Sequence, residues 1–281
     1  MDSWFNEFKE KLTECKIGVG DIVYISSDIT MMLCWASKNL NVQTIEERDI
    51  FLNQFVNTLQ KQVGEIGTLL IPVFTWAFCR EGKYDARSTQ GEVGMLGNWI
   101  LSKRKDFIRT RHPIYSFMVW GKDAGLLYDM KNVDSWGENS PFAYLHHNKG
   151  KNLLFNTTLS RSFTFLHYVE QSVHVPYRYM KTFCGQYTDW NGNCSQAAYS
   201  TYVRDLDIQS RECAKDDCLD DGETAIMICF GVNTLRVVDL EKSYEVIKCN
   251  ILENGANMWY RFDNYVIDWT AGNTHADELL Y

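Results

Sequence analysis

Two short aliphatic runs, separated by helical sequence, constrain the fold of this 281-residue chain more than any other feature. The first run covers residues 22–25, and the second covers residues 68–74 directly after Gly67. Both have the length and composition of buried strands. Between them, residues 29–40 and 45–63 carry apolar positions at helical spacing. This order predicts a right-handed crossover between parallel strands, and therefore an α/β fold.

Further segments show the same alternation of helical and strand-like patterns. The predicted helices cover residues 3–16, 93–101, 166–175 and 244–252, and the predicted strands cover residues 115–120, 151–155, 200–203, 225–230 and 235–238. The pattern changes to shorter runs over the last hundred residues, but no Pro/Ser-rich linker precedes them. We therefore expect an α+β extension that packs on the first unit, not a separately linked domain.

The composition argues against several classes of protein. Lys and Arg total 28 against 36 Asp and Glu, a net charge of −8, whereas proteins that bind nucleic-acid phosphates present a basic face. The nine cysteines include no C-x2-C pair, which favours reduced thiols over a zinc ribbon or a disulfide framework. The N-terminus lacks a signal-peptide pattern, and no apolar run is long enough to span a membrane. We expect a cytoplasmic monomer or homodimer that binds neither nucleic acid nor membranes.

The segment from Phe165 to His174 carries the strongest chemical signal. His167 and Glu170 are three residues apart, so on a helix their side chains are neighbours. A carboxylate orients an imidazole and raises its basicity, which suits a general base near neutral pH. A surface pair without a catalytic role explains the same spacing. A metal site formed by His167, Glu170 and His174 is a further alternative. The order of these ligands in the sequence is not that of zinc-protease helices, and we predict no metal.

Two other polar segments are candidates for anion binding. Arg109 to Ser116 places two arginines and His112 before a predicted strand, which suits a phosphate or carboxylate, although a solvated loop explains it equally. Ser26 and Ser27 lie at a strand-to-helix turn, where backbone N–H groups favour an anion but helix capping alone is sufficient. Neither a dinucleotide fingerprint, a P-loop nor a G-x-S-x-G motif is present.

In unbroken order, these pieces resemble the motifs of the aminoglycoside N(3)-acetyltransferase (antibiotic N-acetyltransferase) family. The resemblance covers residues 18–181, and each motif alone would be weak. The matching segments are Gly20–Ser27 (GDIVYISS), Gly67–Trp76 (GTLLIPVFTW), Tyr84–Thr89 (YDARST), Val93–Leu96 (VGML), Arg109–Ser116 (RTRHPIYS), Trp120–Ala124 (WGKDA), Gly137–Phe142 (GENSPF), Thr164–Glu170 (TFLHYVE) and Val175–Arg178 (VPYR).

The resemblance implies an acyl-coenzyme A-dependent N-acyltransferase built on a central mixed sheet flanked by helices, a fold unrelated to the commoner acetyltransferase superfamily. It implies acetyl-coenzyme A as co-substrate and a primary amine of a cationic amino-sugar or aminoglycoside as acceptor. His167 is then the base that deprotonates the amine, and Glu170 orients it. By the same resemblance, the residues around the coenzyme are Ser26, Ser27, Thr75, Arg111, His112 and Ser116.

We expect residues 1–281 to form a single acyltransferase domain. Residues 1–181 should hold the coenzyme and the catalytic groups, and residues 182–281 should shape the acceptor site. Ser116, Thr75 or a backbone N–H would stabilise the oxyanion. The carboxylates expected to contact a cationic acceptor are Asp205, Asp207, Glu223 and Asp239.

Three segments depart from the family's motifs, all where the coenzyme and its acyl group are predicted to bind. Ile25 replaces a histidine, Gln90-Gly91 replace Pro-Ser, and Leu153–Thr158 replace a glycine-rich strand end. A relative that binds ligand without turnover is therefore one alternative, which the presence of both His167 and Glu170 disfavours. A metal-dependent hydrolase is the second alternative.

Overall fold

The computed structural model describes residues 1–213 and 215–280 and contains one large mixed sheet. Its seven strands are β1 (Ile22–Ser27), β2 (Thr68–Pro72), β4 (Ile108–Arg109), β5 (Phe117–Gly121), β6 (Lys151–Phe155), β10 (Ala225–Phe230) and β11 (Asn233–Asp239). They lie in the order β10-β11-β6-β1-β2-β5-β4. The predicted parallel pairing of the first two strands is confirmed, with Ile22 opposite Thr68.

The centre of this sheet is parallel and its two sides are antiparallel. β1 pairs in parallel with both β2 and β6, while β5 and β11 run antiparallel to their neighbours in the centre. The carboxyl ends of β6, β1 and β2 therefore meet at one edge of the sheet. In open α/β sheets this edge is where ligands bind.

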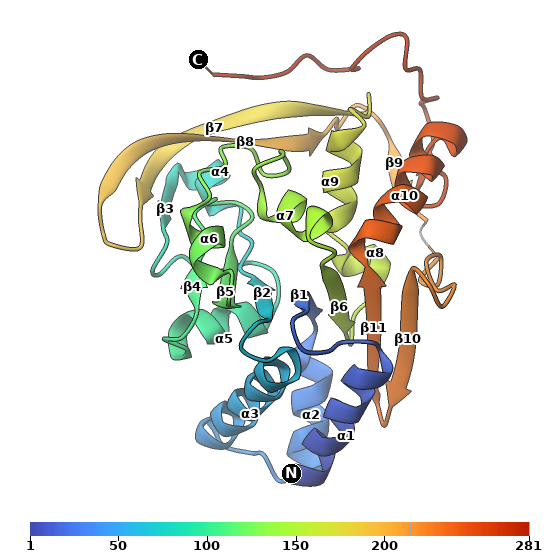
Figure 1. The fold of residues 1–281 in the computed structure, drawn as a ribbon. Helices are drawn as coiled ribbons and strands as arrows, with labels where there is room; N and C mark the ends of the chain where they lie inside the picture. Colours follow the sequence, from blue (N-terminus) through green and yellow to red (C-terminus); the bar gives the residue numbers. More distant parts are fainter. Residues whose placement is uncertain (214, 281) are drawn as a thin grey trace.

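Helices cover both faces of the sheet (Figure 1). One face carries α1 (Asp2–Glu14), α2 (Ile29–Asn39), α3 (Ile45–Val63) and α5 (Met95–Lys103), and the other carries α6 (Ala124–Asp129), α7 (Pro141–His147), α9 (Phe165–Ser172) and α10 (Leu240–Asn254). Successive strand residues point to opposite faces. Accordingly, Val23 and Ile25 lie in the first core, whereas Tyr24 lies in the second.

Local sequence explains where the helices begin. α3 starts with a capping box, because the Thr44 hydroxyl accepts from the Glu47 N–H at 3.1 Å and the Glu47 carboxylate accepts from the Thr44 N–H at 2.9 Å. Asp28 caps α2 in a similar way by accepting from the Thr30 N–H. The predicted helices over 29–40 and 45–63 are confirmed to within a residue.

A second, smaller sheet lies at the end of the molecule opposite the N-terminal helices (Figure 1). It consists of β3 (Lys83–Asp85), β7 (Arg178–Thr188) and β8 (Cys194–Arg204), and the β7–β8 hairpin is long and arched. Two short strands, β9 (Ser210–Glu212) and β12 (Tyr260–Phe262), pair separately, and the remaining short helices are α4 (Ala77–Glu81) and α8 (Leu159–Ser162).

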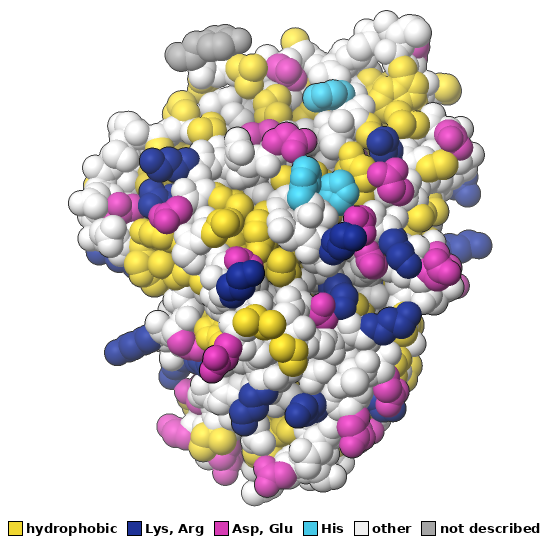
Figure 2. All heavy atoms as spheres, viewed as in Figure 1, with side chains coloured by type: hydrophobic (Ala, Val, Ile, Leu, Met, Phe, Trp, Pro, Cys, Tyr) yellow, Lys and Arg dark blue, Asp and Glu magenta, His cyan; other side chains and the backbone are white. Residues whose placement is uncertain are grey.

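The C-terminal third contributes strands to the central sheet itself. The predicted strands over 225–230 and 235–238 are β10 and β11, and β11 pairs directly with β6 in the central sheet. The segment 178–188 was not predicted as a strand, and the strand expected over 200–203 extends to Cys194–Arg204. Among the described residues, no helix is both long and apolar enough to cross a membrane. On the face shown in Figure 2, basic and acidic side chains are interspersed.

Candidate active site

Helix α9 places the two residues singled out as a possible base and its partner. Its apolar side, with Phe165 and Val169, is buried in the second core, which fixes the orientation of the helix. His167 and Glu170 follow one another on one side of the helix, and His167 Nδ1 lies 2.7 Å from Glu170 Oε2. The predicted contact between the two side chains is therefore present.

Glu170 is completely buried and surrounded by polar partners. The Tyr177 hydroxyl donates to Oε1 at 3.1 Å, and Arg178 Nε lies 2.8 Å from Oε2 as an ion pair. Burial alone would raise the pKa of Glu170, but the charge of Arg178 and the contact with His167 hold it below its usual range. The carboxylate is consequently ionised at neutral pH.

His167 lies at the edge of the buried region, with 29% of its side chain exposed. Burial and the nearby charge of Arg178 lower the pKa of His167 although Glu170 acts in the opposite direction. The ring is therefore neutral at pH 7. Because Nδ1 faces an ionised carboxylate, that nitrogen carries the proton and Nε2 carries the lone pair. None of the described residues forms a hydrogen bond with Nε2, so a base is available there.

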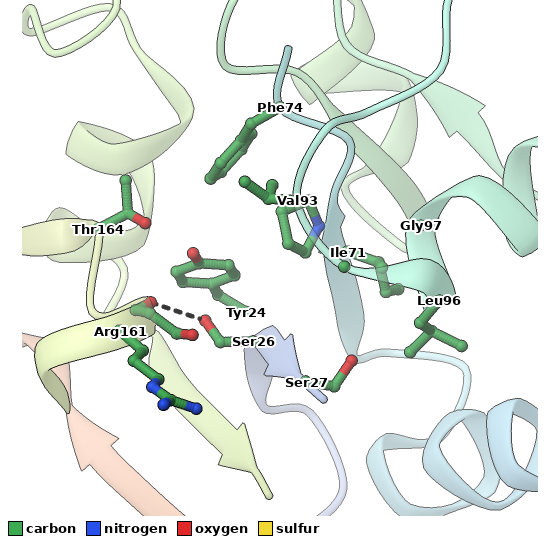
Figure 3. A pocket seen from close by; sticks show the side chains of 13 residues that line it. Tyr24, Ser26, Ser27, Ile71, Phe74, Val93, Leu96, Gly97, Arg161 and Thr164 are labelled. Carbon is green, nitrogen blue, oxygen red and sulfur yellow. Dashed lines mark hydrogen bonds between the residues drawn. The ribbon is translucent and has the colours of Figure 1, made fainter. Parts of the chain in front are cut away.

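A first cavity opens at the carboxyl ends of β1 and β2, where the topology predicts a ligand site. Figure 3 shows Arg161 and Thr164 on one side of it and Gly97 on the other, with Tyr24 and Ser26 between them. Ser27, the last residue of β1, also lines this cavity. Ser26 and Ser27 therefore lie at the strand-to-helix turn predicted for them, and their contact with a coenzyme stays a prediction.

A second cavity adjoins the first and contains the histidine. His167 lines it together with Glu212 of β9 and Tyr260 of β12. The segment Arg161 to Thr164, which connects α8 to α9, contributes residues to both cavities. Ser26 anchors this segment, because its hydroxyl donates to the Ser162 carbonyl at 3.1 Å. The two cavities are therefore neighbours with a common wall.

Thr75 and Ser116 do not line either cavity. Thr75 is buried and donates to Glu92 Oε1 at 2.7 Å. Ser116 is also buried, and its hydroxyl lies between Arg109 Nε at 2.9 Å and the Val73 carbonyl at 3.1 Å. Both hydroxyls are used within the protein, so their predicted contact with a coenzyme or an oxyanion stays a prediction.

Arg111 and His112 likewise lie away from the two cavities. Arg111 donates to the Tyr128 carbonyl at 2.9 Å and stacks on the ring of the same residue. His112 is completely buried; its Nδ1 accepts from two backbone N–H groups and its Nε2 contacts the Val133 carbonyl at 3.2 Å. His112 thus holds its own loop in shape.

Burial of His112 predicts a specific loss of stability in acid. Burial lowers the pKa of His112 to about 4 from 6.5, so between these values the unfolded chain binds a proton that the folded chain does not. Stability is therefore complete above pH 6.5 and falls as the pH decreases, by about 3 kcal/mol at pH 4.5. We expect His112→Gln to lose correspondingly less stability between pH 7.5 and 4.5 in urea denaturation. His275→Gln, at an exposed position, is the control, and an equal pH response of both variants would contradict the prediction.

The other residues nominated from the sequence also have positions away from the cavities. α9 ends at Ser172, so His174 does not share the helical face of His167 and Glu170 on which the metal alternative depended. Within the described residues, no three potential ligands are grouped to hold a metal ion. None of Asp205, Asp207, Glu223 and Asp239 lines either cavity.

Several residues at the two cavities were missed by the sequence analysis. Tyr24, Arg161, Thr164 and Glu212 line them, and Arg178 contacts the His167–Glu170 pair. Thr164 and Arg178 belong to matched motifs, so position in a motif was an available signal. Glu212 offered none, because it lies on a three-residue strand in the divergent part of the chain.

Comparison with known proteins agrees with this arrangement. The family model described as aminoglycoside 3-N-acetyltransferase matches residues 40–249, which is most of the chain. The chain belongs to this family. Membership identifies it as an N-acetyltransferase, and acetyl-coenzyme A is the co-substrate of the family. A search of curated proteins gives no matching sequence.

Solved structures share the fold. Aminoglycoside acetyltransferase AAC(3)-Xa is 18% identical with a TM-score of 0.69, over 89% of this chain and 92% of that chain. AAC-IIIb in its binary form with CoASH is 16% identical with a TM-score of 0.65, over 89% and 96%. The YokD protein from Bacillus subtilis is 16% identical with a TM-score of 0.64, over 87% and 97%. The predicted fold class, a mixed sheet flanked by helices, is confirmed.

Proposed function

We propose that this chain transfers an acetyl group from acetyl-coenzyme A to a primary amine of a cationic amino-sugar or aminoglycoside, with His167 as the general base. The observation that carries the proposal is the common wall of the two cavities, because Arg161 and Thr164 line both and His167 lies in the second. A thioester in the first cavity and an amine in the second would meet beside one imidazole.

The first cavity fits the pantetheine arm of the coenzyme. Ser27 offers a hydroxyl group at the carboxyl end of β1, and Gly94 leaves room for a ligand beside the backbone. Ser26 supports this edge by donating its hydroxyl to the Ser162 carbonyl. Arg161 offers a cation for a phosphate group. Four other residues support the structure around the cavity in this proposal and do not contact the coenzyme, because their polar atoms are bound within the protein: Thr75, Arg111, His112 and Ser116.

His167 and Glu170 would handle the proton. The coenzyme supplies an electrophilic thioester carbonyl and a thiol leaving group. His167 Nε2 removes a proton from the attacking amine, Glu170 stabilises the resulting imidazolium, and His167 returns the proton to the departing sulfur. A positioned base typically contributes about 10²–10⁴-fold to such a step.

Thr164 and Tyr24 are better placed than Ser116 or Thr75 to donate to the oxyanion, because both line the first cavity. Burial raises the pKa of Tyr24, so its phenol keeps the proton that an oxyanion donor needs. The Thr164 side chain lies on the wall shared with the cavity of His167. We propose these two hydroxyls as the oxyanion donors.

Glu212 is the carboxylate that we expect to contact the acceptor. It lines the same cavity as His167 and comes from the C-terminal part predicted to shape the acceptor site. A charge-assisted contact with a substrate ammonium is worth about 1.5–3 kcal/mol, so Glu212→Gln should raise KM for cationic amines about tenfold or more with little change in kcat. Steady-state kinetics measure this, with exposed Glu223→Gln as control. Equal turnover of neutral and cationic acceptors would contradict the prediction.

A thiol-release assay tests the proposed function itself. The protein is mixed with acetyl-coenzyme A and a panel of amino-sugars, aminoglycosides, simple amines and neutral sugars. We expect coenzyme release only with amines, accompanied by an acetylated product that mass spectrometry detects. Coenzyme binding without release for any amine would instead indicate a relative that has lost turnover.

A further inference from the structure

Arg178 contacts both members of the His167–Glu170 pair. It is the first residue of β7, directly after Tyr177, and is 8% exposed. Its Nε lies 2.8 Å from Glu170 Oε2 and its second terminal nitrogen, Nη2, lies 3.1 Å from His167 Nδ1. The same Nη2 donates to the Tyr260 hydroxyl at 3.3 Å, which ties the guanidinium to β12. One buried cation thus touches both the imidazole and the carboxylate.

The two contacts at His167 Nδ1 compete. Glu170 Oε2, at 2.7 Å, requires a proton on Nδ1, and an Nδ1–H cannot accept from Arg178. The contact at 3.1 Å is therefore between two donors, one of which carries a full positive charge. When Nε2 gains a proton, the ring becomes a cation beside another cation. This arrangement opposes protonation of the ring.

The other charged groups that face His167 do not cancel this effect. Glu170 on α9 favours the protonated ring, but Arg178 contacts the same carboxylate oxygen. Glu212 on β9 also favours protonation, from across the open cavity. Tyr177 and Tyr260 are buried and neutral, because burial raises the pKa of each phenol. Burial of the ring, which is the larger cause, and the charge of Arg178 together lower the pKa of His167.

We propose that Arg178 is a positioning residue that keeps His167 unprotonated at neutral pH by placing a second cation against the ring and by sharing the charge of Glu170. The proposal rests on the proposed role of His167 as the base. A carboxylate alone beside the imidazole would leave much of the ring protonated near pH 7, where it cannot accept a proton from the amine. With Arg178 present, Glu170 can still orient the ring, while the second cation opposes protonation of the ring.

The test compares the pH dependence of four proteins: the wild type, Arg178→Gln, Arg178→Lys and Arg236→Gln. Arg236 is the matched control, because it is also buried and ion-paired, with Asp216 and Asp220, but does not contact His167 or Glu170. The ratio of variant to wild-type kcat/KM cancels the titration of the amine itself. For Arg178→Gln this ratio should fall about three- to sevenfold from pH 9 to pH 6 if the His167 pKa rises by one unit from a value of about 5.5–6.5. Arg178→Lys and Arg236→Gln should give ratios that stay constant with pH.

Direct titration of the His167 imidazole by NMR separates this proposal from the proposed function. We expect a wild-type pKa below 6.5, an upward shift in Arg178→Gln and a downward shift in Glu170→Gln, where the cation remains alone. A uniform loss of activity in Arg178→Gln with an unmoved His167 titration would overturn the proposal and leave the base assignment intact. If Arg178→Gln does not fold, two other results would overturn the proposal. One is a His167 pKa above 7 in the wild type. The other is a ratio of Arg178→Lys to wild-type kcat/KM that varies with pH as strongly as expected for Arg178→Gln. A shifted titration together with full activity of His167→Ala would support the role of Arg178 and defeat the proposed function.

Discussion

His167→Ala is expected to lower kcat by about 10²–10⁴-fold while leaving the affinity for coenzyme A within about twofold of the wild type. The side chain lines the second cavity and not the first, where we propose that the coenzyme binds, and its proposed role is proton removal. Single-turnover kinetics measure the first quantity, and coenzyme titration by calorimetry measures the second. Glu170→Gln should be milder, because the amide keeps a hydrogen bond to the ring, and should recover partly at higher pH.

His174→Ala is the control for this prediction. His174 follows the end of α9 and lines neither cavity, so its loss should change kcat little. If His174→Ala were as damaging as His167→Ala, and if activity followed the amount of bound metal, the base assignment would be wrong and the metal-dependent hydrolase would become the better explanation.

Gly97→Ala is expected to abolish the stabilisation that coenzyme A gives to the wild type. A ligand at a hundredfold excess over its Kd stabilises the folded protein by about 2.7 kcal/mol. Gly97 lies where α5 crosses the end of β2, and an added Cβ would lie 2.1 Å from the Pro72 carbonyl oxygen. Both residues line the first cavity, where we propose that the coenzyme binds, so relief of this clash must move a wall of that cavity. Overpacking of this kind also destabilises the protein itself by about 1–3 kcal/mol.

Thermal unfolding with and without coenzyme A measures both effects. Gly125→Ala is the matched control, because Gly125 lies in α6 and an added Cβ meets nothing within 4 Å. That variant should keep the full shift and be unchanged or slightly more stable. A normal coenzyme shift in Gly97→Ala would mean that coenzyme A binds elsewhere.

The elements that the sequence predicts well are those whose own residues contain the signal. The aliphatic runs of β1 and β2 are buried on both faces, and the capping box at Thr44 and Glu47 fixes the start of α3. The spacing of His167 and Glu170 likewise places their contact correctly, because one turn of a helix determines it. These features depend on interactions within a short segment.

The features that escaped prediction depend on distant partners. β7 alternates irregularly between buried and exposed positions, and it becomes a strand because β8 and β3 pair with its two edges. Glu212 and Arg178 acquire their positions only when β9 and β7 fold against α9. Thr75 and Ser116 occur in matched motifs, yet their hydroxyls face the protein interior, and a motif alone does not indicate such a direction.

The order of the central sheet has a consequence for biosynthesis. β6 lies between β1 and β11 in the sheet. β11 follows β6 in the sequence by some eighty residues, so it leaves the ribosome much later. Until then, a nascent chain that already contains α9 has an unpaired edge along β6 and an apolar surface that awaits α10. Such an intermediate is a natural client for chaperones. Interrupted translation within the C-terminal third should thus yield aggregates or degradation products rather than a smaller active enzyme.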